Sequence, residues 1–171
     1  MIPKIDLSKI KITKKLLESE EISMQNARRQ LLDALDSKLT FDVPKDLVQQ
    51  ELDILYENAI RAGKPFNEKR EKKETYRRLK LGLILTEWGN ENGITVENEE
   101  IENVLWQEVS RYANAQEVFE LYRQNPSTTS MVALLIFEQK VLDAMLAQTN
   151  LKKKGGSKHL PPKTTNQITK I

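Results

Sequence analysis

The stretch NEKREKKETYRRLKLGLILTEW, residues 67–88, sets the architecture expected for this chain. Residues 67–74 carry almost only charged side chains, whereas residues 75–88 are apolar on most sides of a helix. A helix that is polar all round stands in solvent, and one that is apolar all round is buried. We therefore predict one long helix whose second half lies in the protein body and whose first half projects from it as an arm.

Further helices are expected on both sides of this one. Apolar residues at three- and four-residue spacing predict a helix from about Thr13 to Lys38. Pro44 suits the first turn of the next helix, where its missing N–H would have no partner in any case, and Gly63 suits its end. The remaining predictions are a helix capped by Thr95, a short helix over residues 118–122, and the very apolar residues 127–148, which we expect to form the central core helix.

The predicted fold class is all-α, a helical body with projecting helical arms. Only six glycines and six prolines among 171 residues argue against the many turns of an all-β fold. We divide the chain into a lead-in with the start of a linker helix (1–27), a helical domain (28–150) and a basic, disordered tail (151–171). Within the long helix we expect Gly82 to permit close packing of a second helix, because an interior glycine otherwise costs about 1 kcal/mol relative to alanine.

Charge and hydropathy limit the classes of partner and the location that we expect for this protein. The net charge of +2 is too balanced for nucleic-acid binding over the whole surface. The lysines of the tail indicate either a solubilising segment or an electrostatic contact with RNA or another acidic surface. No apolar run reaches the roughly 20 residues of a membrane helix, and the first residues lack a signal-peptide core, so we expect a cytoplasmic protein.

The sequence offers little material for catalysis. It has no cysteine, no glycine-rich phosphate loop, and a single histidine, His159, which falls in the predicted tail. The acidic cluster at Glu97, Glu99, Glu100 and Glu102 lies at the start of a predicted helix, where carboxylates complement the helix dipole. We therefore expect no catalytic residue, no metal and no cofactor. Five apolar residues are instead candidates for an exposed binding surface or for packing within the body, namely Tyr56, Ile60, Phe66, Leu121 and Tyr122.

Five motifs, in order, resemble the C-terminal, client-binding domain of bacterial trigger factor, and the resemblance covers about Arg28 to Leu146. It implies a cradle of two arms that holds nascent or unfolded polypeptide without ATP, with roles in protein folding, protein transport and cell division. The motifs are FDVP with LV and Glu51 (41–51), RRLKLGLIL (77–85), Glu87 with NGI (92–94), VFELYRQNP (118–126) and IFEQKVLD (136–143).

One client-binding patch of that family falls here on Tyr112, Val118 and Leu121, with Tyr122 beside them. Glu108 occupies a position that is often apolar in the family, which weakens the patch. The sequence has no counterpart of the ribosome-docking or prolyl isomerase domains, so we expect neither isomerase activity nor direct ribosome docking.

Other functions remain open. A periplasmic chaperone of the related SurA type would share the fold, although no signal peptide is seen. A helical scaffold or dimerisation module would use the apolar surface for self-association and bind no client. An enzyme is the third possibility, and the inventory of reactive residues argues against it.

Overall fold

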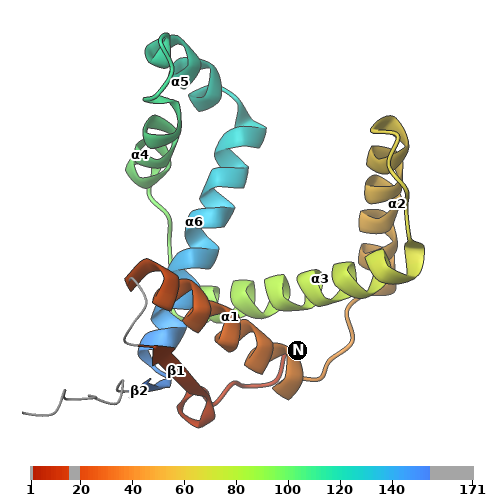
Figure 1. The fold of residues 1–171 in the computed structure, drawn as a ribbon, viewed down its shortest axis with the longest axis vertical. Helices are drawn as coiled ribbons and strands as arrows, with labels where there is room; N and C mark the ends of the chain where they lie inside the picture. The colour runs from red at the N-terminus through yellow and green to blue at the C-terminus, as the bar shows by residue number, and fades with distance from the viewer. Residues whose placement is uncertain (1, 16–19, 155–171) are drawn as a thin grey trace, which may run out of the picture.

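The computed structural model describes residues 2–15 and 20–154 of the chain. Within these residues six α-helices surround a hollow, and two short strands lie at the base (Figure 1). This helical architecture confirms the predicted fold class. The elements are the 3-10 helix η1 (Leu7–Lys9), β1 (Lys11–Lys15), α1 (Glu20–Lys38), α2 (Lys45–Arg61), α3 (Glu68–Glu91), α4 (Asn98–Val109), α5 (Ala115–Arg123), α6 (Pro126–Ala147) and β2 (Asn150–Lys154).

Helix α3 has the predicted two-part character. Its first turn is capped by Asn67, whose side chain accepts a hydrogen bond from the backbone N–H of Arg70. The first half is largely solvent-exposed and carries α2, whereas the second half crosses the body (Figure 1). Gly93 follows its end with a φ of +66°, a conformation that side chains with a Cβ rarely adopt. The buried apolar residues of α3 all lie in its second half: Leu81, Ile84, Leu85 and Trp88.

The close crossing between α3 and α6 occurs at Gly89, not at Gly82 as the sequence suggested. A Cβ on Gly89 would lie 2.4 Å from Cζ of Phe137 and 2.6 Å from Cγ2 of Val141, whereas a Cβ on Gly82 would meet no heavy atom within 4 Å. Both glycines are interior to the same helix, so no local pattern favours Gly89 over Gly82. The two positions differ only because side chains of α6 pack against Gly89 and none packs against Gly82.

The main core lies where α1, α3 and α6 meet. Ala27, Leu31 and Leu35 of α1 are fully buried there, which confirms the apolar stripe predicted for this helix. The expected lead-in also belongs to this core, because Ile10 and Ile12 are only 2% and 1% exposed. The first residues therefore pack with the body.

Two predictions about the ends were wrong. Residues 11–15 are a strand, not the start of a helix at Thr13, and they pair in parallel with residues 150–154, where the sequence suggested the start of a disordered tail. Gln30 of α1 completes this arrangement, since its side-chain amide accepts a hydrogen bond from the Thr13 N–H and donates one to the Thr13 carbonyl. Residues 155–171, the rest of the predicted tail, lie outside the described residues.

Ion pairs tie the helices of the body together. Arg28 on α1 forms a bidentate pair with Asp143 on α6, at 2.9 and 2.8 Å. Lys80 on α3, which is 7% exposed, donates to the Asp36 carboxylate at 3.0 Å and to the Asp36 carbonyl at 2.6 Å. Burial opposes ionisation of Asp36, but hydrogen bonds from Lys80 and Arg77 outweigh it, so the pKa of this carboxyl lies below its usual value.

Candidate functional site: a two-armed hollow with exposed apolar side chains

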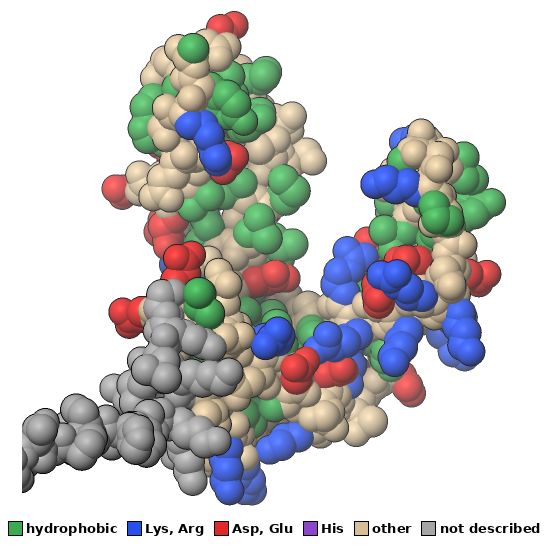
Figure 2. Space-filling model, in the orientation of Figure 1, with side chains coloured by type: hydrophobic (Ala, Val, Ile, Leu, Met, Phe, Trp, Pro, Cys, Tyr) green, Lys and Arg blue, Asp and Glu red, His purple; other side chains and the backbone are tan. Residues whose placement is uncertain are grey.

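Two arms rise from the body and face each other across a hollow (Figure 1). We call residues 43–79 the α2 arm, which consists of α2, its return segment and the first part of α3. We call residues 98–137 the α4–α6 arm, which consists of α4, α5 and the first half of α6. Apolar side chains gather on both arms in the space-filling view (Figure 2). The site is therefore an extended surface. Its properties depend on which apolar side chains of each arm remain exposed to solvent.

The α2 arm has a small core of its own. Val43, Val48 and Leu52 are buried there, and Leu79 and Leu83 from the middle of α3 pack against them. Tyr56 is 51% exposed and packs edge-on against Phe66, with the ring centroids 5.3 Å apart. Two elements side by side cover only one face of each other, so the other face stays in solvent. The large apolar residues that remain exposed on this arm are Leu47, Ile54, Tyr56, Ile60 and Tyr76.

The α4–α6 arm also buries few of its apolar side chains. Only Leu105, Val109 and Val132 are buried apolar residues, and α5 has no buried residue. Trp106 of α4 packs edge-on against Phe119 of α5, at 5.4 Å between centroids, and is still 43% exposed. Helix α4 begins at Asn98, later than expected from Thr95, because Glu100 accepts a hydrogen bond from the Glu97 N–H and closes the first turn.

The client-binding residues suggested by the sequence lie on this arm. Val118, Leu121 and Tyr122 are on α5, at the three- and four-residue spacing that places side chains near one face. Tyr112 lies in the turn before α5 and is 48% exposed. Leu121 is the most exposed large apolar residue of the described chain, at 67%, whereas Val118 and Tyr122 are half-buried.

The five apolar residues that the sequence analysis gave as candidates for an exposed binding surface also fall into an exposed and a half-buried group. Tyr56, Ile60 and Leu121 are exposed, in agreement with the sequence analysis, while Phe66 and Tyr122 are half-buried.

Sequence reasoning missed an apolar surface on α6. We expected the whole of this helix to be core, but its first half exposes Met131, Leu134 and Leu135 to 59%, 52% and 59%. Only its second half, from Phe137 onward, is packed into the body. The sequence of a helix that is apolar on all sides does not indicate which half is buried. That information comes only from the neighbouring helices in the tertiary structure.

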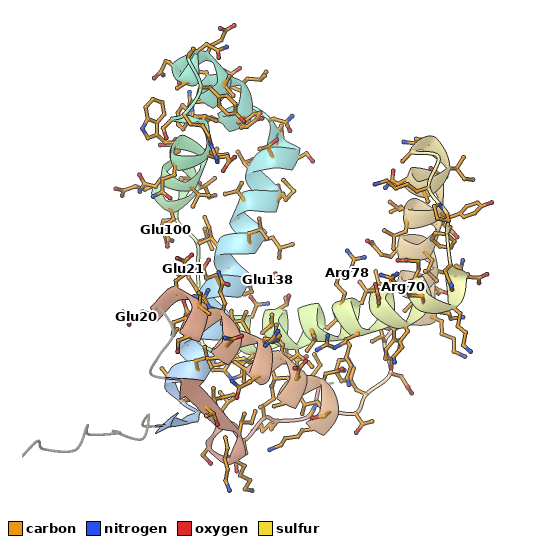
Figure 3. The ribbon with its side chains drawn as sticks, in the orientation of Figure 1. Glu20, Glu21, Arg70, Arg78, Glu100 and Glu138 are labelled. Carbon is orange, nitrogen blue, oxygen red and sulfur yellow. The ribbon has the colours of Figure 1, made fainter. Side chains whose placement is uncertain are left out.

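A groove lies at the base of the hollow, where α1, α3 and α6 meet. Its volume is about 540 Å³, and we call it the floor groove. Figure 3 shows Glu138 on α6 and Arg78 on α3 at the bottom of the hollow. Burial raises the pKa of the Glu138 carboxyl. The groove is lined by Leu32, Glu74, Arg77, Arg78, Leu81, Gly82, Leu85, Glu138 and Leu142.

Within residues 2–15 and 20–154, no three histidine, cysteine or carboxylate side chains are grouped so that they could hold a metal ion. The same part of the chain contains no helix with both the length and the hydropathy needed to span a bilayer. His159 lies outside the described residues.

Comparison with known proteins decides the family. The model of the bacterial trigger factor C-terminus matches residues 5–147. This chain belongs to the trigger factor C-terminal family. The match begins well before Arg28, in agreement with the packing of the first residues into the core.

Curated relatives support this membership. The trigger factor of Chelativorans sp. strain BNC1 is 34% identical over 146 residues, which is 77% of this chain and 31% of that protein. The trigger factor of Agrobacterium fabrum is 32% identical over 163 residues, or 86% of this chain and 33% of that protein. The chain thus spans about a third of the length of the trigger factors that it matches.

Solved structures agree with the fold. A structure of trigger factor domains from Thermotoga maritima superposes with a TM-score of 0.68 at 15% identity, covering 84% of this chain and 93% of that one. A hypothetical Mycoplasma protein superposes with a TM-score of 0.58 at 9% identity, covering 89% and 88%. At these identities the likeness concerns the fold alone. Membership of a chaperone family nevertheless agrees with the two-armed hollow and its exposed apolar side chains.

Proposed function

We propose that this chain is a holdase domain, which binds unfolded or nascent polypeptides in the hollow between its arms without ATP and without catalysing a reaction. One observation carries the proposal: large apolar side chains stand 36% to 67% exposed on both arms. A soluble monomer rarely leaves so much apolar surface uncovered unless the surface binds something. A trigger factor of similar fold, at 18% identity and a TM-score of 0.58, is a chaperone with promiscuous substrate recognition in folding and assembly.

In the proposed mechanism a client contacts several apolar patches at once, and each contact is weak by itself. Burying one large apolar side chain contributes about 1.5–3 kcal/mol, part of which is lost in ordering the client. Several separated patches that act on one chain raise the apparent affinity without any tight individual contact. Such a surface releases its client quickly and discriminates poorly between sequences.

Charged residues beside the patch keep the empty arm soluble. Arg111 pairs with Glu108 at 2.7 Å and Arg123 pairs with Glu120 at 2.8 Å, both within a single turn of chain. These pairs are exposed and contribute little to stability. Their proposed role is to surround Tyr112 and Leu121 with hydrated groups that leave the apolar faces open.

We assign the client patch to Tyr112, Val118, Leu121 and Tyr122, and we place the protein in the cytoplasm without direct ribosome docking. The test is suppression of aggregation of a denatured model protein at rising chain concentration. Replacing Tyr112, Val118 and Leu121 together by serine is expected to weaken suppression severalfold while the helical circular dichroism stays unchanged.

The matched control replaces Gln107 and Gln116, exposed polar residues of the same arm, by serine and should leave suppression intact. Equal loss in both variants would remove the patch from the site. No suppression by the unmodified chain at any ratio would refute the holdase proposal. A mass that rises with concentration, together with absent suppression, would favour the alternative of a scaffold or dimerisation module.

A further inference from the structure

We propose that the two-stranded sheet at the base of the molecule binds the phosphate backbone of a nucleic acid duplex, by charge and without reading the base sequence. The strands are β1 (Lys11–Lys15) and β2 (Asn150–Lys154), and we call them together the lysine sheet. The lysine sheet lies at the base, outside the hollow between the arms (Figure 1). The proposal therefore does not depend on the holdase function.

The lysine sheet concentrates positive charge. Its strands read KITKK and NLKKK, so six of the ten residues are lysine and none is acidic. The parallel register sets Lys14 opposite Lys153 and Lys15 opposite Lys154. Neighbouring strands lie about 4.8 Å apart and five residues span about 16 Å, so the six lysines share a small area. Like charges directly opposite each other destabilise a sheet, and a polyanion bound across both strands would relieve that repulsion.

The helix that packs on the lysine sheet contributes a neutral contact. The α1 side chain bound to β1 is the amide of Gln30, which exchanges hydrogen bonds with the Thr13 backbone. Two aspartates that follow on α1 are engaged with cations of α3 instead. These pairs are Asp33 with Arg77, and Asp36 with both Arg77 and Lys80.

Further cations adjoin the lysine sheet. Lys38, at the end of α1, donates to the Lys9 carbonyl at 3.1 Å and so lies close to the start of β1. Lys9 pairs with Asp6 at 3.0 Å, and Asp6 is the one acidic residue in the segment 2–15. The sequence contains no aspartate or glutamate after Asp143. Figure 2 shows Lys and Arg side chains at the base of the molecule, so the positive charge extends beyond the two strands.

This composition favours a nucleic acid over a protein partner or a membrane. The cores of protein–protein interfaces are enriched in aromatic residues and arginine and depleted in lysine. A basic patch holds a protein stably on a bilayer only together with an apolar or lipid anchor. Within the described segment 2–15 no large apolar side chain is exposed, since Leu7, Ile10 and Ile12 are buried and Ile2 and Ile5 are half-buried.

The same residues favour a duplex over a single strand. A duplex carries one negative charge per 1.7 Å or so of its axis, about twice the density of one strand, and lysine binds phosphate as a point charge. Proteins that hold single strands stack the bases on aromatic side chains, and neither strand of the lysine sheet contains an aromatic residue. Contacts to phosphates alone carry no sequence information, so we expect non-specific binding with a Kd of about 1–100 μM.

The test is fluorescence anisotropy of labelled DNA duplexes titrated with the full chain, at salt concentrations from about 50 to 200 mM. Two duplexes of unrelated sequence should bind with Kd values within about twofold of each other, and the corresponding single strands should bind about tenfold more weakly. The logarithm of the affinity should fall linearly with the logarithm of the salt concentration, by about 0.9 for each phosphate contacted.

One variant removes the facing lysines and a second controls for net charge. Replacing Lys14, Lys15, Lys153 and Lys154 together by glutamine should weaken duplex binding at least tenfold at low salt and reduce the salt dependence by up to about 3.6, four times 0.9. The matched control makes the same change of charge on the α2 arm, where its four lysines are exposed, and should bind within about twofold of the unmodified chain. The control lysines are Lys64, Lys69, Lys72 and Lys73.

A third variant keeps the sheet if the first one unfolds. Lys153→Glu with Lys154→Glu places opposite charges across the register from Lys14 and Lys15, which favours pairing of the strands. This variant should keep its helical circular dichroism and its urea midpoint and still lose duplex binding at least tenfold. Retained binding in this folded variant would overturn the proposal.

The remaining outcomes are equally decisive. Absence of duplex binding at low salt, an affinity that does not change with salt, or equal loss in the lysine-sheet variant and its control would overturn the proposal. Tighter binding to a single strand, to polyglutamate or to vesicles of anionic phospholipid than to the duplex would also overturn it. Suppression of aggregation should be the same in all variants, so the holdase proposal stands or falls separately.

Discussion

The sharpest prediction concerns the two interior glycines of α3, because their surroundings are opposite. Gly89 is buried where α3 crosses α6, and Gly82 faces open space. Replacing either glycine by alanine gains helix propensity of about 1 kcal/mol, since alanine restricts the unfolded chain and favours the helix. The propensity gain is therefore common to both variants and cancels when they are compared.

The difference between the variants isolates the cost of the added methyl group at the crossing. In Gly89→Ala the Cβ would lie 2.4 Å from Cζ of Phe137 and 2.6 Å from Cγ2 of Val141, distances that atoms do not tolerate without movement. Val141 is fully buried and β-branched, so it has few ways to yield. Overpacking of this kind costs about 1–3 kcal/mol.

We expect Gly82→Ala to be more stable than the original chain by up to about 1 kcal/mol, and Gly89→Ala to be less stable than Gly82→Ala by about 1–3 kcal/mol. The measurement is urea unfolding followed by circular dichroism at 222 nm, with both midpoints and slopes compared. Equal stability of the two variants would refute the reasoning, because it would mean that α6 does not approach α3 at Gly89. A further replacement of Val141 by alanine in the Gly89→Ala background should recover part of the loss by making room.

Three further predictions concern the body. Ile12→Ala should destabilise the chain by about 2–5 kcal/mol in urea unfolding, because Ile12 is 1% exposed and its removal leaves a cavity beside β1; a change below about 0.5 kcal/mol would mean that the first residues do not join the core. A double-mutant cycle of Arg28→Ala and Asp143→Ala should give a coupling energy of about 0.5–1 kcal/mol, reduced at high salt, since the bidentate pair is partly exposed. The Asp36 carboxyl has a lowered pKa in the folded state, so its contribution to stability is full above its unfolded pKa of about 4 and is lost as the pH falls through the folded value. Asp36→Asn should therefore flatten the acid side of the stability–pH profile, and an unchanged slope below about pH 4 would contradict this.

Local patterns were enough to indicate most of the helices and the family. The contrast between residues 67–74 and 75–88 is such a pattern, and the structure confirms a helix that is exposed at one end and buried at the other. Caps and stops are likewise local, because the Asn67 side chain accepts a hydrogen bond from the N–H three residues later, and Gly63 and Gly93 adopt a positive φ. The motifs indicated the trigger factor family for the same reason, since they are strings of neighbouring residues.

Features that depend on distant partners emerged only in the folded chain. The strand at residues 11–15 exists because residues 150–154 pair with it, and no local pattern reveals a partner so far along the chain. Gly89 and not Gly82 meets α6, and only the second half of α6 is covered, because burial is a property of the neighbours and not of the residue itself.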